Sequence, residues 1–253
     1  MAADQWCQGL LVINFDWAEL TRNGIISIVQ QSLSVSPNPI PVPEFHSRIV
    51  TLLKKHIPIR FKKKFVPNAL KIGQVAISGY YYLDYDQIGN KPIELIFFYH
   101  SRDDHIKLNR KRIDNIGVLA ADTILHEIIH MSQFRKKNFL VCPEYRSCAR
   151  RVKNRAAQEY LGKFDEIDAY AFNIVDELAD RFGPDQSKIV AYINSDQRYR
   201  RQRNNSWLMY IRAFEHDHSH PVIRRLKKRV VKYLDRIHTG RPYDVNPWLT
   251  PPK

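Results

Sequence analysis

The sequence contains few cysteines and lacks the segments that send a protein to a membrane or through it. Its three cysteines, Cys7, Cys142 and Cys148, are an odd number, and no secretory signal precedes them. This argues against a disulfide framework and favours a reducing compartment. The start, Met1–Trp6, has no basic region followed by an apolar stretch, and apolar runs such as Ile93–Tyr99 are too short to span a bilayer. We therefore expect a cytoplasmic or otherwise intracellular protein without a membrane span.

Acidic residues are also scarce relative to basic ones. Forty lysines and arginines face 26 aspartates and glutamates, which gives a formal net charge of +14. Such a chain attracts polyanions, namely nucleic acid, acidic protein or anionic lipid, although a basic surface can also serve only solubility. No helix-turn-helix, zinc-finger or RNA-binding signature accompanies the charge. The basic residues cluster in six segments: Lys54–Lys64, Lys107–Arg112, Arg135–Lys137, Arg150–Arg155, Arg198–Arg203 and Arg224–Lys232.

The chain is long enough for one generous domain, and it has no internal repeats. Alternate prolines between Ser34 and Pro43 favour extended backbone, so residues 1–43 are interpreted as an N-terminal extension with a proline-rich strap. The remaining residues, 44–253, are expected to form one domain. It would comprise a sheet and a long helix within 44–140, a helical subdomain within 141–240, and an irregular tail, 241–253.

Hydrophobic periodicity predicts the elements. Strands are expected at Leu10–Phe15, Ile77–Tyr85 and Pro92–His100, the last two as a hairpin, with a basic extended segment at Ile57–Phe65. Helices are expected at Glu44–His56, Ile116–Phe134, Ala156–Phe182, Ser187–Asn194, Trp207–Phe214 and Pro221–Ile237. Asp114 or Asn115 is the expected cap of the second of these helices.

The segment His126-Glu127-Ile128-Ile129-His130 carries the chemistry of the sequence. Two histidines four residues apart project from one face of a helix, as a tetrahedral zinc ion requires of two nitrogen ligands. Glu127 is rotated by about 100° from His126, so it lies beside the metal, where it can accept a proton from water. Apolar residues surround the motif, and buried polar side chains are costly unless something satisfies them. The alternative is a pair of core histidines hydrogen-bonded to neighbours, with Glu127 paired to a cation.

A catalytic zinc usually has three protein ligands and one water. The acidic cluster at Asp165–Asp168 offers the third. On the expected helix, Glu166 has small neighbours that would let a second helix approach, whereas Asp168 has apolar neighbours that suit a free carboxylate poorly. One of the two is expected to bind the metal, and the other to orient a ligand histidine. The alternative is a solvated acidic patch.

The His126–His130 motif, followed by Glu166-Ile167-Asp168-Ala169-Tyr170-Ala171-Phe172, resembles the zincin superfamily of metallopeptidases in its glutamate-ligand branch, the gluzincins. The likeness covers about Tyr80–Phe182, and the second segment is similar to the E-x-x-A-D pattern of the CAAX prenyl proteases. It implies zinc as cofactor, Glu166 as third ligand, and a preceding strand whose edge binds the substrate backbone. Tyr170 stands where the prenyl-protease pattern has aspartate, which leaves Asp168 open as the ligand.

The resemblance also implies a mechanism. Zinc polarises the scissile carbonyl and lowers the pKa of its water to about 7, and Glu127 passes the proton to the leaving amine. Tyr170, Tyr210 and His218 are candidates for stabilising the oxyanion.

We therefore expect an α+β, zincin-like fold, with a small, mostly antiparallel sheet before the buried motif helix. The expected function is that of a zinc metallopeptidase acting on a protein or peptide substrate. The alternative is a basic structural or nucleic-acid-associated protein, of phage or mobile-element type, that retains a zincin fold with a non-catalytic metal site.

Overall fold

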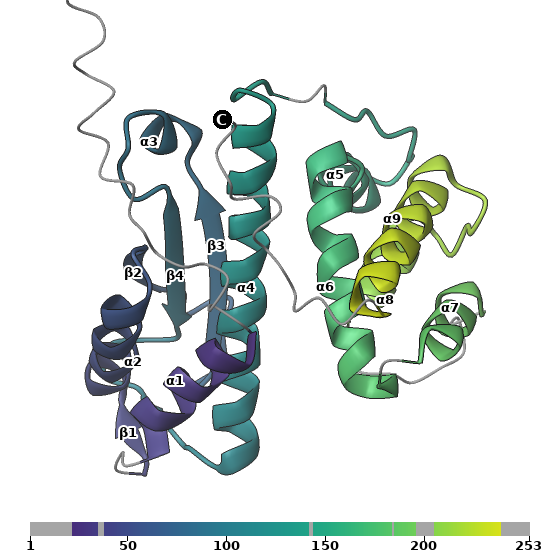
Figure 1. Cartoon of the computed structure of the whole chain (residues 1–253). Coiled ribbons are helices and arrows are strands. Elements are labelled where there is room, and N and C mark those ends of the chain that lie inside the picture. The colour runs from purple at the N-terminus through teal and green to yellow at the C-terminus, as the bar shows by residue number, and fades with distance from the viewer. Residues whose placement is uncertain (1–21, 35–37, 142–143, 184, 196–204, 239–253) are drawn as a thin grey trace, which may run out of the picture. The chain divides into compact units, whose positions relative to one another are not determined.

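The computed structural model describes residues 22–34, 38–141, 144–183, 185–195 and 205–238. The described residues fall into two compact units, one up to Phe139 and the other from Leu140 onward (Figure 1). The first unit combines helices with small sheets, and the second is helical. The expectation of a mixed α+β protein is thus confirmed. The expected strand at Leu10–Phe15 and the expected tail, 241–253, lie outside the described residues.

A three-stranded sheet forms the centre of the first unit. Its strands are β2 (Arg60–Phe65), β3 (Val75–Tyr81) and β4 (Ile93–Tyr99), in the order β2-β4-β3. β4 pairs with β2 in parallel and with β3 in antiparallel orientation. The apolar β4 is almost wholly buried, as a central strand flanked on both edges should be. The predicted antiparallel pairing is present. The predicted strand end at Tyr85 was wrong, because β3 ends at Tyr81 and the short helix α3 (Leu83–Gln87) forms the connection.

Helices cover one face of this sheet. Helix α2 (Val42–His56) buries Phe45, Ile49 and Leu53, and its His46 ring packs edge-on against Phe97 of β4. The helix begins two residues before the predicted start, because proline is accommodated in a first helical turn. Helix α1 (Arg22–Ser34) packs against α2 and α4, and the short strands β1 (Ile40–Pro41) and β5 (His105–Ile106) pair with each other.

The helix that carries the histidine motif is α4 (Arg110–Lys136), which packs against β3, β4 and α1. It begins six residues before the predicted Ile116. Asn109 is its N-cap, and the Asn109 side chain accepts a hydrogen bond from the Arg112 amide at 2.9 Å. The predicted cap, Asp114, lies inside the helix and accepts a hydrogen bond from Gln30 of α1 at 2.8 Å. The prediction of a cap at Asp114 or Asn115 was therefore wrong.

The second unit contains five described helices. They are α5 (Val152–Leu161), α6 (Phe164–Phe182), α7 (Gln186–Asn194), α8 (Ser206–Ala213) and α9 (Pro221–His238). The long amphipathic helix α6 packs against the other four, around a core that includes Trp207, Tyr210 and Phe214. Among the described residues, no helix combines the length and apolarity needed to cross a membrane.

The single helix predicted for Ala156–Phe182 is in fact two helices. α5 ends at Leu161, and Lys163 takes an extended backbone before α6 begins. Gly162 stands at the break, where the Tyr145 ring packs so close that any side chain would overlap it. Glycine has a low helix propensity, and the ring occupies the space beside it, so the helix is interrupted here. The apolar stripe in the sequence nevertheless continues across this break.

Candidate metal centre

The two histidines of the motif converge on the surface of α4. His126 and His130 are 6% and 7% exposed, and their Nε2 atoms lie 3.0 Å apart. The rings meet edge to face, with their centroids 4.6 Å apart. Two neutral nitrogens aimed at each other at this distance repel unless a proton or a cation lies between their lone pairs. The predicted i, i+4 arrangement is therefore present, with both rings turned to one point.

A neighbouring amide fixes the orientation of one ring. His130 Nδ1 lies 3.2 Å from Oε1 of Gln133, one turn further along α4. An amide oxygen only accepts hydrogen bonds, so the proton of a neutral His130 belongs on Nδ1. Nε2 then carries a lone pair, as a metal-ligating nitrogen must. Gln133 was not singled out in the sequence, although its spacing from His130 was visible there.

Glu127 lies against β3 in the first unit. Its side chain is 7% exposed, and it covers Gly79 so closely that a Cβ atom there would lie 2.5 Å from Glu127 Cγ and 2.6 Å from Oε1. Thr123 Cγ2 would lie 2.8 Å from the same Cβ. A strand residue with any side chain would thus displace the glutamate. Sequence reasoning missed Gly79, and the signal was a lone glycine within a tyrosine-rich strand.

Glu166 lies in the first turn of α6, in the second unit, and is 7% exposed. The Tyr160 hydroxyl, from α5, hydrogen-bonds with Glu166 and with Tyr170. Burial, followed by the charge of Glu166, raises the pKa of Tyr160 well above its ordinary value. The phenol therefore stays protonated at neutral pH and can donate. The break between α5 and α6 sets Tyr160 beside Glu166, an arrangement that a continuous helix would not give.

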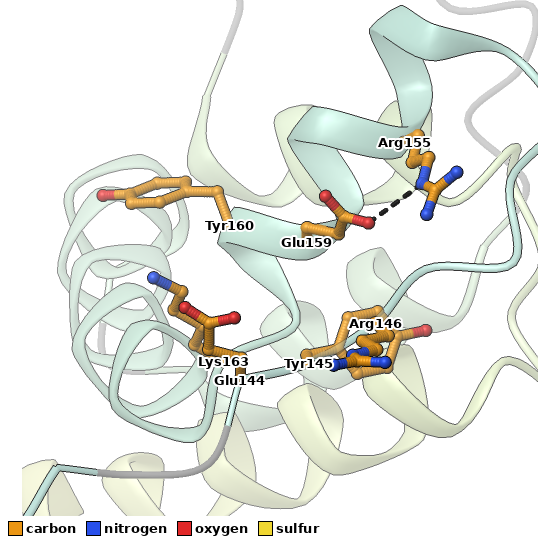
Figure 2. Close-up of a pocket in the computed structure, with 7 residues that line it drawn as sticks. All are labelled: Glu144, Tyr145, Arg146, Arg155, Glu159, Tyr160 and Lys163. Carbon is orange, nitrogen blue, oxygen red and sulfur yellow. Dashed lines mark hydrogen bonds and ion pairs between the residues drawn. The ribbon is translucent and has the colours of Figure 1, made fainter.

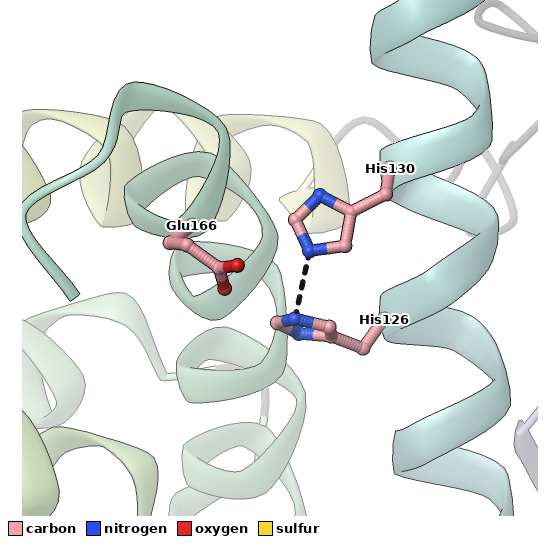
Figure 3. A group of neighbouring side chains, drawn as sticks. All are labelled: His126, His130 and Glu166. Carbon is pink, nitrogen blue, oxygen red and sulfur yellow. Dashed lines mark hydrogen bonds between the residues drawn. The ribbon is translucent and has the colours of Figure 1, made fainter. Parts of the chain in front are cut away.

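His126, His130 and Glu166 form the one group of metal-ligating side chains found among the described residues. Each offers one ligand atom, and these atoms lie within 4.8 Å of one another. Figure 3 draws the three side chains, with the rings of His126 and His130 facing each other. Two imidazole nitrogens and one carboxylate oxygen form a donor set that suits zinc and also other divalent transition metals.

The remaining predicted site residues all lie in the second unit. Asp168, the alternative ligand, is outside this group, and its Oδ1 lies 3.5 Å from Arg229 Nε of α9. Tyr210 is fully buried and donates a hydrogen bond to the Leu161 carbonyl at 3.0 Å. Tyr170 packs edge-on against the Tyr210 ring. His218 contacts Lys227, with Nδ1 3.0 Å from Nζ, and its ring packs against Trp207.

A pocket of about 400 Å³ opens beside Tyr160 in the second unit. Figure 2 shows its polar lining and the ion pair between Arg155 and Glu159, which measures 3.0 Å. The lining residues are Glu144, Tyr145, Arg146, Arg155, Glu159, Tyr160 and Lys163.

No protein-family model matches the chain, and no curated protein or solved structure matches it either.

Proposed function

We propose that this protein is a zinc-dependent peptidase with a zincin-like fold of the glutamate-ligand type. One observation carries the proposal: two buried imidazoles from consecutive turns of α4 present their Nε2 atoms to each other at 3.0 Å, and Glu127 follows His126 directly. In our proposal Glu166 supplies the third ligand, since its carboxylate belongs to the same group of ligand atoms. Three protein ligands would leave a fourth position open for water or substrate.

When bound, a zinc ion supplies a Lewis acid and makes a water molecule acidic enough to react near neutral pH. The chain's own residues do the rest. Glu127 accepts a proton from the attacking water and delivers it to the leaving amine. Gly79 leaves room for the Glu127 side chain against β3, and Gln133 would keep the His130 Nε2 lone pair available to a metal. These contacts hold the reacting groups in place before substrate arrives.

Two tyrosines are the best donors for the oxyanion that develops during attack. Tyr160 and Tyr170 are joined by a hydrogen bond beside Glu166, and Tyr160 stays protonated at neutral pH. Tyr210 is less suited, since its hydroxyl already donates to a backbone carbonyl in the core. Donors that are fixed before reaction stabilise developing charge more effectively than mobile ones. We assign the role to Tyr170 or Tyr160.

Strand β3 supports a peptide as substrate. It is an outer strand of the sheet among the described residues, and it runs directly under Glu127. An extended peptide can pair with the open edge of such a strand through backbone hydrogen bonds. The pairing would place a peptide bond near the motif without demanding a particular side chain.

The first test is metal content, measured by elemental mass spectrometry on the purified chain. We expect one zinc per chain, and its loss in the double variant His126→Ala, His130→Ala. Glu166→Ala should weaken binding strongly, whereas Asp168→Ala serves as the matched control on the same helix. If the wild type takes up no zinc even when it is supplied, the proposal fails.

Activity is tested separately, with a fluorescently labelled, unfolded protein such as casein. Glu127→Gln should retain zinc and lose hydrolysis, because an amide cannot accept the proton. Equal hydrolysis by wild type and Glu127→Gln would show that Glu127 has no catalytic role. A zinc-loaded wild type that leaves every peptide intact would favour the alternative, a non-catalytic metal site.

A further inference from the structure

Positive charge is concentrated in one part of the first unit. Between Phe45 and Leu83 the chain has no acidic residue at all. The same segment holds eight cationic side chains: Arg48, Lys54, Lys55, Arg60, Lys62, Lys63, Lys64 and Lys71. Four of the eight fall in the six residues of β2, which is an outer strand of the sheet. The charge is therefore displayed along one edge of the sheet.

The strand register divides these cations between two faces. Arg60 lies opposite Glu94, Lys62 opposite Ile96 and Lys64 opposite Phe98. On the other side of β4, Tyr80 also lies opposite Glu94. Side chains at directly paired positions share a face of a sheet. Arg60, Lys62, Lys64 and Tyr80 thus lie on the same face, and this is the face opposite the one that α2 and α4 cover, because Phe97 and Gly79 point the other way.

Aromatic rings accompany these cations. Tyr80 and Tyr85 are 46% and 40% exposed. Tyr82 lies between them, with its ring centroid 6.3 Å from Tyr80 and 5.5 Å from Tyr85, stacked on the latter. The Arg60 guanidinium lies over Tyr82 and Tyr85 at 4.5 Å and 4.2 Å from the ring centroids. The rings and cations lie on the same side of the sheet, and together they are named the aromatic–basic face, defined by Arg60, Lys62, Lys64, Tyr80, Tyr82 and Tyr85.

The carboxylate of Glu94, which lies within this face, does not cancel the positive charge of the face. Glu94 is 1% exposed and is held by Lys62 at 3.0 Å, by Arg60 at 3.4 Å and by the Tyr82 hydroxyl at 3.0 Å. It fixes two cations in place and is itself hidden from solvent. Lys64 makes no ion pair with any described residue. The face therefore presents net positive charge beside exposed rings.

Cations on the opposite face add to the same positive field. The pKa of His46 is lowered to about 4, first by burial and then by the positive charges of Lys63 and Lys54. Lys63 comes from β2 and Lys54 from α2, so cations of two elements act on one point. A polyanion approaching the β2 edge would meet the charge of both faces.

We propose that the aromatic–basic face binds single-stranded nucleic acid. Lys62 and Lys64 would contact successive phosphates, and the exposed rings of Tyr80 and Tyr85 would stack on bases. Base stacking on aromatic side chains, combined with a basic track for the backbone, is the general means by which proteins hold single strands. A duplex hides its bases from such rings, and an acidic peptide has no aromatic bases to stack on them. The face and the metal centre are separate features, so this proposal does not depend on peptidase activity.

The test is fluorescence anisotropy of a labelled oligothymidylate of about 20 nucleotides, titrated with the full chain. Each ring removed, in Tyr80→Ala or Tyr85→Ala, should weaken binding about tenfold. Lys64→Glu should weaken binding. It should also reduce the slope of log affinity against log salt concentration by about one or more, since at least one fewer counterion is released. Lys232→Glu on α9 is the matched control, since it makes the same charge change at an exposed site of the second unit.

Four results would overturn the proposal. Binding that Lys232→Glu reduces as much as Lys64→Glu would indicate attraction by net charge alone. Unchanged affinity in Tyr80→Ala and Tyr85→Ala would remove the role of stacking. Tighter binding of the corresponding duplex, or equal competition by polyglutamate, would assign the face to another polyanion. Thermal unfolding of each variant shows that a loss of affinity is not a loss of the fold.

Discussion

Replacing Gly79 by alanine should separate catalysis from metal binding. The new Cβ would lie 2.5 Å from Glu127 Cγ, 2.6 Å from its Oε1 and 2.8 Å from Thr123 Cγ2. Carbon atoms in ordinary contact are about 3.5–4.0 Å apart. Glu127 would therefore have to retreat by about 1 Å, while the two histidines, one turn apart on the same helix, need not move.

The size of the effect follows from that displacement. A misplacement of about 1 Å in a catalytic group can cost about 100-fold in rate, so kcat should fall by about this factor. Overpacking costs about 1–3 kcal/mol, and alanine recovers about 0.5–1 kcal/mol over glycine in a strand. The net loss of about 2.5 kcal/mol or less is small beside a domain stability of about 5–15 kcal/mol. The variant should fold and should keep its zinc.

The assay measures casein hydrolysis and zinc content on the same samples, and it presumes the proposed peptidase activity. Ser78→Ala is the matched control, because its side chain is directed to the opposite face of β3 and it should retain both properties. Wild-type activity in Gly79→Ala would refute the view that this strand positions Glu127. Loss of zinc in parallel with activity would show that the substitution disturbs the whole centre.

Two further predictions concern Gln133 and His46. Gln133→Ala should lower zinc affinity about 10–100-fold, because the Gln133 amide oxygen would no longer hold the proton on His130 Nδ1. Competition with a chromophoric chelator measures this affinity, and an unchanged value would exclude the role. His46 has its pKa lowered from 6.5 to about 4, so between these values the unfolded chain binds a proton that the native chain does not. Stability should therefore fall as the pH drops through this window, by about 1–2 kcal/mol after discounting for the partly exposed ring. Urea unfolding at pH 7 and pH 4.5 should show this loss in the wild type, and a smaller one in His46→Gln; an equal loss in both would contradict the assignment.

Several elements could be predicted because their signals are local. The apolar run at Ile93–Tyr99 identified the central strand β4, and the four-residue spacing of His126 and His130 placed both rings on one face of a helix. The amphipathic stripe of α6 was visible as well, since helical periodicity needs no knowledge of distant residues. Motif chemistry and helix geometry act over a few residues, and the sequence alone contains them.

Helix ends were harder to predict, because they depend on which side chains cap the helix or pack beside its ends. Asp114 was predicted to cap α4, but its carboxylate accepts a hydrogen bond from Gln30, which lies 84 residues earlier. Asn109 caps the helix instead. The break at Gly162 depends on the Tyr145 ring, which packs where a side chain would be. In both cases a residue from elsewhere in the fold determined which of several allowed local structures formed.

The sequence by itself determined the motif, its helix and the excess of positive charge, because each follows from residue types and short spacings. Only the tertiary structure decided that Gly79 lies under Glu127, that Tyr160 reaches Glu166, and that the cations of β2 share a face with exposed tyrosines. These relations depend on strand register and on the path of the chain through distant segments. Shifting a strand by one residue would turn every side chain to the other face, and no local pattern records which register the chain adopts.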